Sequence, residues 1–193
     1  NAYVAGTFNQ EAQFGSTTLT NAGLASFFAK VDASGQFLWA KAFATPNSIE
    51  PVKLLVQDAA AVFLGGSFNG EITLGNDTLR CRSWQRLGFV AKADPAGNFL
   101  WGRPVTGLLQ NAALDAAGNV VVTANSGEYS AAPANALSKF SSQGSLLWTR
   151  ITEHPYAYEA MPLITDRDNN IYLAGGLYSQ GTFGGTRFYQ PGG

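Results

Sequence analysis

An internal repeat limits the folds available to this chain more than any other feature of the sequence. Trp39, Trp101 and Trp148 lie in the similar segments FLWAK, FLWGR and LLWTR, 62 and 47 residues apart. A residue that opens a turn stands seven positions before each tryptophan. These residues are Asp32, Asp94 and Ser141. Phased similarity of this kind indicates one small structural unit that is copied along the chain.

Each copy consists of four short apolar runs. A second set of related segments, YVAGTF, FLGGSF, VVTANS and YLAGGL, begins at Tyr3, Phe63, Val121 and Tyr172. The runs are rich in Val, Phe, Leu and Trp and are bounded by Gly, Asn, Asp or Pro, as β-strands are. None has the 3.6-residue period of a helix. Four antiparallel strands per copy are typical of propeller blades, so the sequence predicts an all-β chain of four-stranded blades.

The composite unit resembles the SBBP-type bacterial β-propeller repeat. The shared features are YVAGTF, then FG with a Leu-containing hairpin, then FVAK, an Asp turn and LW. The resemblance is good over residues 1–107 and looser over 108–193, where the third unit has lost the long hairpin between its second and third strands. It implies a very long bacterial protein that is secreted or displayed on the cell surface, of the kind exported by type IX secretion.

The repeat divides the chain into blade segments of approximately 1–46, 47–107, 108–154 and 155–193. These amount to about three and a half blades of one partial propeller, whereas a closed propeller has ~4–8 blades. We therefore expect the chain to be an excerpt of a longer protein. Its remaining blades, or another protein chain, would cover both ends, and residues 1–193 alone would be unstable, oligomeric or aggregated because edges and apolar faces are left open.

Composition excludes several classes of partner. The formal net charge is −1 and charged residues make up 13% of the chain, against about 25% in an average soluble domain. Such a chain has no basic field with which to attract nucleic acid. No apolar run reaches the ~18 residues of a membrane span. Cys81 is the single cysteine, so it cannot form an internal disulfide.

Carboxylates are the residues that an enzymatic interpretation would need most. Five of the aspartates occupy repeated turn positions, where turn chemistry already explains them. They are Asp32, Asp58, Asp94, Asp115 and Asp166. His154 and Cys81 lie outside any recognisable nucleophile or metal motif. We therefore predict that the chain is not an enzyme, has no catalytic residue and needs no cofactor.

Two interpretations of the repeated tryptophans are open. Trp39, Trp101 and Trp148 could form a stacking platform for sugars, but one tryptophan at an equivalent strand position of each blade favours packing between blades.

In DRDNN, Asp166, Asp168 and Asn170 have the spacing of oxygen-ligand Ca²⁺ loops. A plain Asx turn is the favoured alternative there, because the corresponding loops lack the second aspartate.

The least repetitive segment is LRCRSWQR, residues 79–86, which carries Arg80, Arg82, Trp84 and Arg86. Loops on a rigid scaffold are where binding residues concentrate. An Arg- and Trp-rich hairpin could bind an anionic glycan or an acidic protein surface through stacking and forked hydrogen bonds. The favoured alternative is a variable loop whose tryptophan packs on a neighbouring blade.

Three functions follow from these features. The first is a non-enzymatic extracellular scaffold and protein- or glycan-binding module. The second is a lectin-like propeller with carbohydrate sites between its blades. The third is a quinoprotein-type enzyme domain, which loosely shares the D-x-x-G-x-x-x-W pattern, but the sequence shows no recognisable cofactor and calcium ligands of that class.

Overall fold

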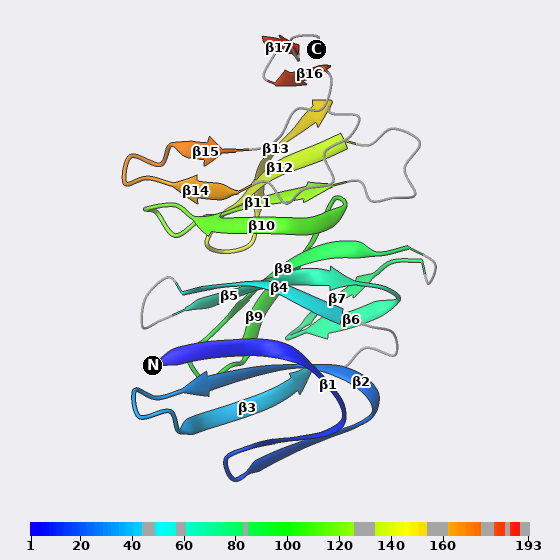
Figure 1. Ribbon diagram of the computed structural model, residues 1–193, viewed down its shortest axis with the longest axis vertical. Helices are drawn as coiled ribbons and strands as arrows, with labels where there is room; N and C mark the ends of the chain where they lie inside the picture. The colour runs from blue at the N-terminus through cyan, green and yellow to red at the C-terminus, as the bar shows by residue number, and fades with distance from the viewer. Residues whose placement is uncertain are drawn as a thin grey trace. The chain divides into compact units, whose positions relative to one another are not determined.

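The computed structural model describes residues 1–43, 49–56, 61–82, 85–125, 134–153, 162–174, 180–183 and 186–189. Across these ranges the backbone forms strands, turns and irregular segments and no helix, which confirms the all-β prediction. All strand pairings among the described residues are antiparallel (Figure 1). The chain has two compact units, Asn1–Pro104 and Val105–Gly193, and each is described by itself.

The first sheet has the strand order β1-β2-β3. Its strands are β1 (Ala2–Phe14), β2 (Thr17–Val31) and β3 (Phe37–Phe43). The two long strands form one continuous hairpin that is interrupted by a bulge between Asn9 and Glu11. Gln10 is the extra residue of this bulge and has a φ of 64°. The hairpin tip folds back so that Phe14 contacts Ala29 and Ala40 on one face of the sheet.

The second sheet is a meander with the order β4-β5-β8-β9. Its strands are β4 (Ile49–Val56), β5 (Val62–Phe68), β8 (Leu87–Ala93) and β9 (Phe99–Val105). A separate hairpin of β6 (Glu71–Leu74) and β7 (Asp77–Arg80) is inserted between β5 and β8. All seven residues of β5 are buried, as a continuously apolar run predicts for a strand that is covered on both faces.

The second unit contains a third meander, β10-β11-β12-β13, extended by β16 and β17. These strands are β10 (Leu108–Leu114), β11 (Val120–Asn125), β12 (Ala134–Phe140), β13 (Leu146–Glu153), β16 (Gln180–Phe183) and β17 (Thr186–Tyr189). β14 (Leu163–Thr165) and β15 (Ile171–Leu173) form a separate two-stranded sheet. The fourth repeat segment therefore does not build one sheet, because its β16–β17 hairpin pairs with β13.

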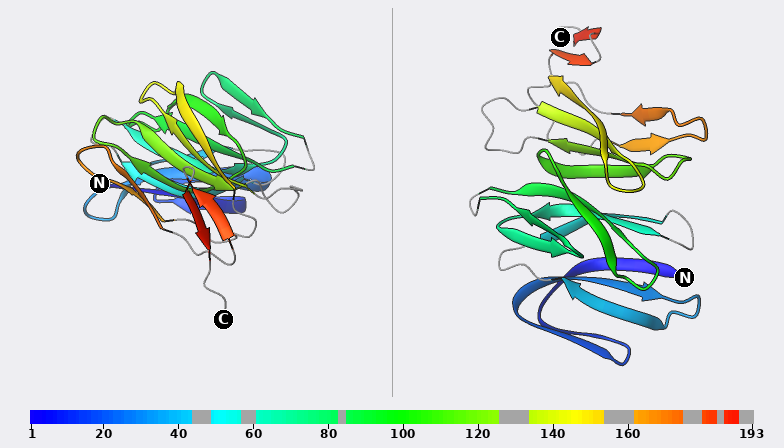
Figure 2. Two further views of the ribbon diagram at one scale, coloured as in Figure 1. Left: turned by 90° about the horizontal axis from the view of Figure 1, so that it is seen from above. Right: turned by 180° about the vertical axis from the view of Figure 1, so that it is seen from behind.

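The core of the first unit lies between its two large sheets, which Figures 1 and 2 show face to face. Phe28 and Trp39 of the first sheet pack there against buried side chains of the second, among them Leu64, Phe89 and Ala91. Burial of each large apolar side chain contributes about 1.5–3 kcal/mol. A smaller cluster in the second unit contains Leu163 of β14.

The meanders have the strand order of propeller blades, since four antiparallel strands follow one another in sequence. The described strands form no closed propeller. The arrangement of blades around a common axis therefore stays a prediction.

Candidate functional site

The most regular feature of the described residues is a five-residue turn that occurs five times among them. The turns begin at Asp32, Asp94, Asp115, Ser141 and Asp166. In each, the first residue donates its N–H to the carbonyl of the fifth, and the fourth donates to the carbonyl of the first. A side-chain oxygen of the first residue accepts the backbone N–H groups of the third and fifth. The turns that the sequence pattern predicts therefore form, and all five have the same hydrogen bonds.

The fourth position of these turns requires a left-handed backbone. Four turns have glycine there, with φ between 74° and 84°, at Gly35, Gly97, Gly118 and Gly144. The fifth has Asn169 with a φ of 65°. Asparagine tolerates this conformation better than most residues. DRDNN therefore folds as the same turn as the glycine-containing copies.

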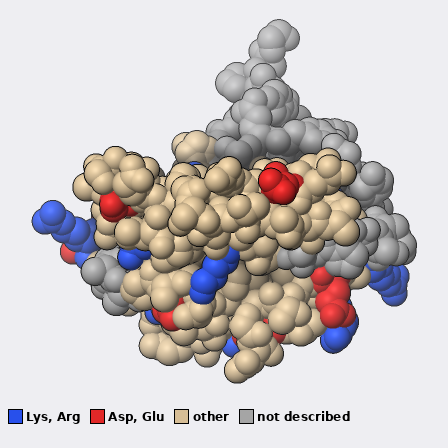
Figure 3. All heavy atoms as spheres, turned by 90° about the horizontal axis from the view of Figure 1, so that it is seen from below, with Lys and Arg blue, Asp and Glu red and all other residues tan. Residues whose placement is uncertain are grey.

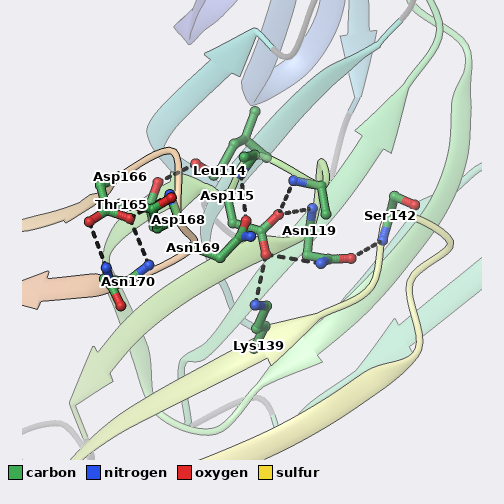
Figure 4. Close-up of polar contacts among 12 residues, drawn as sticks. Leu114, Asp115, Asn119, Lys139, Ser142, Thr165, Asp166, Asp168, Asn169 and Asn170 are labelled. Atoms are coloured by element: carbon green, nitrogen blue, oxygen red, sulfur yellow. Dashed lines mark hydrogen bonds and ion pairs between the residues drawn. The ribbon is translucent and has the colours of Figure 1, made fainter.

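Asp166, Asp168 and Asn170 consequently lie together in the arrangement of the Asx-turn interpretation (Figure 4). One carboxylate oxygen of Asp166 accepts the backbone N–H groups of Asp168 and Asn170, and the other accepts the Asn170 amide and the Tyr172 hydroxyl. These bonds, with that from the Asn170 side chain foremost, lower the pKa of Asp166. Within the described ranges, no three Asp, Glu, His or Cys side chains group to hold a metal ion.

Hydrogen bonds join three of the turns in the second unit (Figure 4). The buried Asp115 carboxylate pairs with Lys139 Nζ at 2.7 Å and accepts the Asn119 amide at 2.9 Å. Asn119 Oδ1 accepts the Ser142 N–H at 3.2 Å, which ties in the Ser141 turn. Asn169 Oδ1 accepts the Ala116 N–H at 3.0 Å, and the Thr165 hydroxyl donates to the Leu114 carbonyl. These hydrogen bonds therefore connect the turns that begin at Asp115, Ser141 and Asp166 to one another.

In the first unit a turn of the second sheet sits on the tryptophan strand of the first. Trp39 Nε1 donates to the Pro95 carbonyl at 3.1 Å, and Lys30 Nζ reaches the same oxygen at 3.4 Å. Lys41 Nζ donates to Asn98 Oδ1 at 2.6 Å. A Cβ added at Gly97 would stand 2.6 Å from the Trp39 ring, so the glycine makes this close approach possible. We call this set the Trp39–turn contact.

Each repeated tryptophan is the third residue of its strand. Trp101 is buried, at 6% exposure, whereas Trp39 and Trp148 are half-buried. A cation two residues further on lies 5.9–6.0 Å from each ring centroid; these cations are Lys41, Arg103 and Arg150. The rings are thus occupied by packing and by cations, which favours the structural interpretation over an open platform for sugars.

The arginine-rich segment begins at the end of β7. Arg80 pairs with Glu71 at 2.6 Å on the surface, and exposed pairs of this kind contribute little to stability. The half-buried Cys81 donates its backbone N–H to Gly70 at 2.8 Å, and its thiol contacts the Phe68 and Gln85 carbonyls. Arg82 and Arg86 are exposed. Trp84 lies outside the described residues, so its packing partner is not defined.

A cleft of about 350 Å³ opens where the two large sheets of the first unit meet the β6–β7 hairpin. Its lining consists of Phe28, Lys41, Ala42, Phe43, Thr73, Gly75, Gly97, Asn98 and Phe99. The Phe43 and Phe99 rings meet edge to face, 5.6 Å apart, and the exposed Thr73 hydroxyl lies 3.4 Å from that of Thr78. The sequence did not predict this cleft, because its residues come from four separate segments and share no single motif.

Five described aspartates have a pKa that does not suit a general acid. The pKa is lowered at Asp32, Asp77, Asp94, Asp115 and Asp166. At Asp77 the Gly102 N–H at 3.0 Å is the main cause, assisted by Arg103 at 2.7 Å. A general acid at neutral pH needs the opposite shift. Figure 3 shows charges of both signs scattered over one face of the molecule, without a single-sign patch.

No family model matches the chain, and no curated protein matches it either. No helix of the described residues is long and apolar enough to cross a membrane.

Proposed function

We propose that the chain is part of a β-propeller that serves as a non-enzymatic scaffold and binding module in a large secreted or surface protein of the SBBP type. The observation that carries this proposal is the Trp39–turn contact, in which one repeat places a turn on the tryptophan of its neighbour. A device of this kind joins successive copies of a repeat, so that each copy contacts only its neighbours. The five aspartates whose pKa is lowered support a structural role, because each accepts hydrogen bonds that favour its ionised form.

The test of this proposal is the structure of the natural full-length polypeptide by crystallography or electron microscopy. We expect four-stranded blades around a common axis, with residues 1–193 contributing consecutive blades. A linear stack of sheets, or a two-sheet sandwich, would contradict the propeller. A signal peptide on the same polypeptide would support export, and its absence from the complete reading frame would count against it.

A lectin-like function is the second candidate, and the cleft of the first unit favours it. Pockets that bind small ligands measure about 300–1,000 Å³ and combine an apolar lining with a few polar groups. The cleft offers Phe43 and Phe99 as apolar lining, with Lys41, Thr73 and Asn98 as polar groups. This arrangement suits a single hydroxylated ring better than an extended chain.

A glycan array probed with the full chain tests this second candidate. Thr73→Val removes an exposed hydroxyl from the cleft and should abolish binding to the preferred glycan. Thr18→Val changes an equally exposed threonine on the hairpin of the first sheet, outside the cleft lining, and should leave binding intact. Equal binding by both variants and the unmodified chain would rule the cleft out as the glycan site.

A further inference from the structure

The two sheets of the first unit have equivalent positions that differ sharply in exposure. Val4 in β1 corresponds to Leu64 in β5, since each is the second residue of YVAGTF or FLGGSF. Leu64 is completely buried against the first sheet, whereas Val4 is 39% exposed. Because side chains alternate along a strand, Val4 points away from the face that carries Tyr3 and meets the second sheet. Phe14 of the hairpin tip covers Ala29 and Ala40 on this face. The part of the face around Val4 is therefore open in the first sheet and covered in the second.

Neighbouring positions repeat this difference. Ala2 is exposed while its counterpart Val62 is fully buried, and Val31 is half-buried while its counterpart Ala93 is buried. We call the surface formed by Ala2, Val4, Val31 and turn 32–36 the Val4 face.

The turn on this face is also open. Gly35 has a φ of 84°, close to the 76° of Gly97, so the two turns share one backbone conformation. An added Cβ would meet the Trp39 ring at Gly97 but nothing within 4 Å at Gly35. The carbonyl that accepts the indole N–H belongs to the second residue of the turn, Pro95. Its counterpart is Ala33, which is exposed.

We propose that the Val4 face binds a further sheet of the same repeat, whose outer strand places a tryptophan on turn 32–36. The indole N–H donates to the Ala33 carbonyl, as that of Trp39 does to Pro95, and the ring covers Gly35. A lysine or arginine two residues after that tryptophan reaches the Gln36 side chain, as Lys41 reaches Asn98. This proposal rests on the proposed scaffold function, in which sheets of this repeat stack side by side.

The full chain can be extended so that it supplies this sheet itself. Asn1 corresponds to Asn119, because Ala2 and Val120 each pair with the residue that follows a repeated lysine, Val31 and Phe140. A copy of residues 47–118 can therefore be joined directly before Asn1. The added copy supplies a complete second sheet, with its own tryptophan strand, and a first strand for the existing β1–β3 sheet.

Hydroxyl-radical footprinting of the full chain and of the extended chain measures the exposure of Val4. We expect labelling of Val4 in the extended chain to fall to the level that Leu64 has in the unextended chain. Leu24 is 45% exposed and lies on the opposite face of the first sheet from Val4, so it should stay labelled in both chains. Trp101→Ala made only in the added copy should restore labelling of Val4. Phe28, which is 1% exposed between the two sheets and occurs once in each chain, reports folding, since it is labelled only if the sheets come apart.

A second extension protects the test against a copy that does not fold. Residues 108–169 joined before Asn1 supply the Trp148 strand in place of the Trp101 strand, and they should protect Val4 equally. Persistent labelling of Val4 in both folded extensions would overturn the docking proposal, while the scaffold proposal keeps its separate test by imaging. If the unextended chain sediments as a discrete dimer with Val4 already protected, the occupant is a second copy and our proposal is wrong.

Discussion

At the scale of single residues, Trp101 is the repeated tryptophan that is most clearly a core residue, at 6% exposure. Trp101 contacts Phe63 edge to face, 5.8 Å between ring centroids, while the adjacent Leu100 is 55% exposed. We expect Trp101→Ala to lower the free energy of unfolding by about 3–5 kcal/mol, as truncation of a large core side chain does. Leu100→Ala should change it by less than about 0.5 kcal/mol. Urea denaturation of the full chain measures both, and equal effects would contradict the packing role.

Asp115 gives the stability of the second unit a pH dependence. Its burial alone would raise the pKa, but hydrogen bonds from Lys139 and Asn119 outweigh burial and lower the pKa below 3.8. A lowered folded-state pKa means that the stabilisation is present above the ordinary value and is lost as the pH falls through the folded-state pKa. Asp115→Asn should therefore cost about 1.5–3 kcal/mol at pH 7, the value of a hydrogen bond to a charged group.

Denaturation from pH 7 down to pH 2 tests this effect. The difference between the variant and the unmodified chain should shrink once the pH is below the ordinary aspartate value. Asp168→Asn, at an exposed position of the Asp166 turn, is the matched control and should leave stability unchanged. A difference that stays constant across this range would show that the charge of Asp115 is not the cause.

Sequence reasoning at this scale identified which residues recur but not what they contact. The Asp turns were predictable because their hydrogen bonds are local, within five residues. The bond from Trp39 to Pro95 was not, because it joins residues 56 positions apart and depends on how two sheets meet. The same holds for the cleft, where Lys41, Thr73 and Asn98 converge only in the folded unit.

At the scale of elements, turn 94–98 is a local structure and also contacts Trp39 of the neighbouring sheet. A substitution at Gly97 distinguishes these two roles. Alanine at a left-handed position costs about 1–2 kcal/mol, and this cost applies to Gly97 and Gly35 alike. At Gly97 the new methyl group would also meet the Trp39 ring, which adds about 1–3 kcal/mol of overpacking. Gly97→Ala should therefore destabilise the chain more than Gly35→Ala in thermal or urea denaturation. Equal losses would mean that the Trp39–turn contact contributes nothing.

The strands themselves were largely predictable, because alternation and glycine-bounded runs are local signals. Their grouping into sheets was less so. In the first sheet the hairpin belongs to β1 and β2 themselves, whereas in the second it is a separate sheet, β6–β7. The sequences QFGSTTL and TLGNDTL give no sign of this difference. The pairing of β16 with β13 likewise depends on tertiary structure that the repeat does not encode.

At the scale of the whole molecule, stability in a repeat chain is a sum of units and of the interfaces between neighbours. The Val4 face is one interface for which the chain provides no cover among its described residues. Covering a side chain such as Val4 stabilises a protein by up to about 1.5–3 kcal/mol, and covering the turn adds to this. For a chain of this length each kcal/mol raises Tm by about 2–4 °C.

The chain extended by a copy of residues 47–118 should accordingly melt several degrees higher than the unextended chain, by about 3–12 °C from these values. It should also scatter less light on heating, since an open apolar face and the unpaired edge of β1 promote association. Differential scanning calorimetry with static light scattering measures both properties. The matched control is the same extension with Trp101→Ala in the added copy alone, which keeps the added length but removes the ring that would cover Gly35. If that control melts as high as the intact extension, the added stability comes from chain length or from strand pairing, and the tryptophan-on-turn contact does not join the repeats.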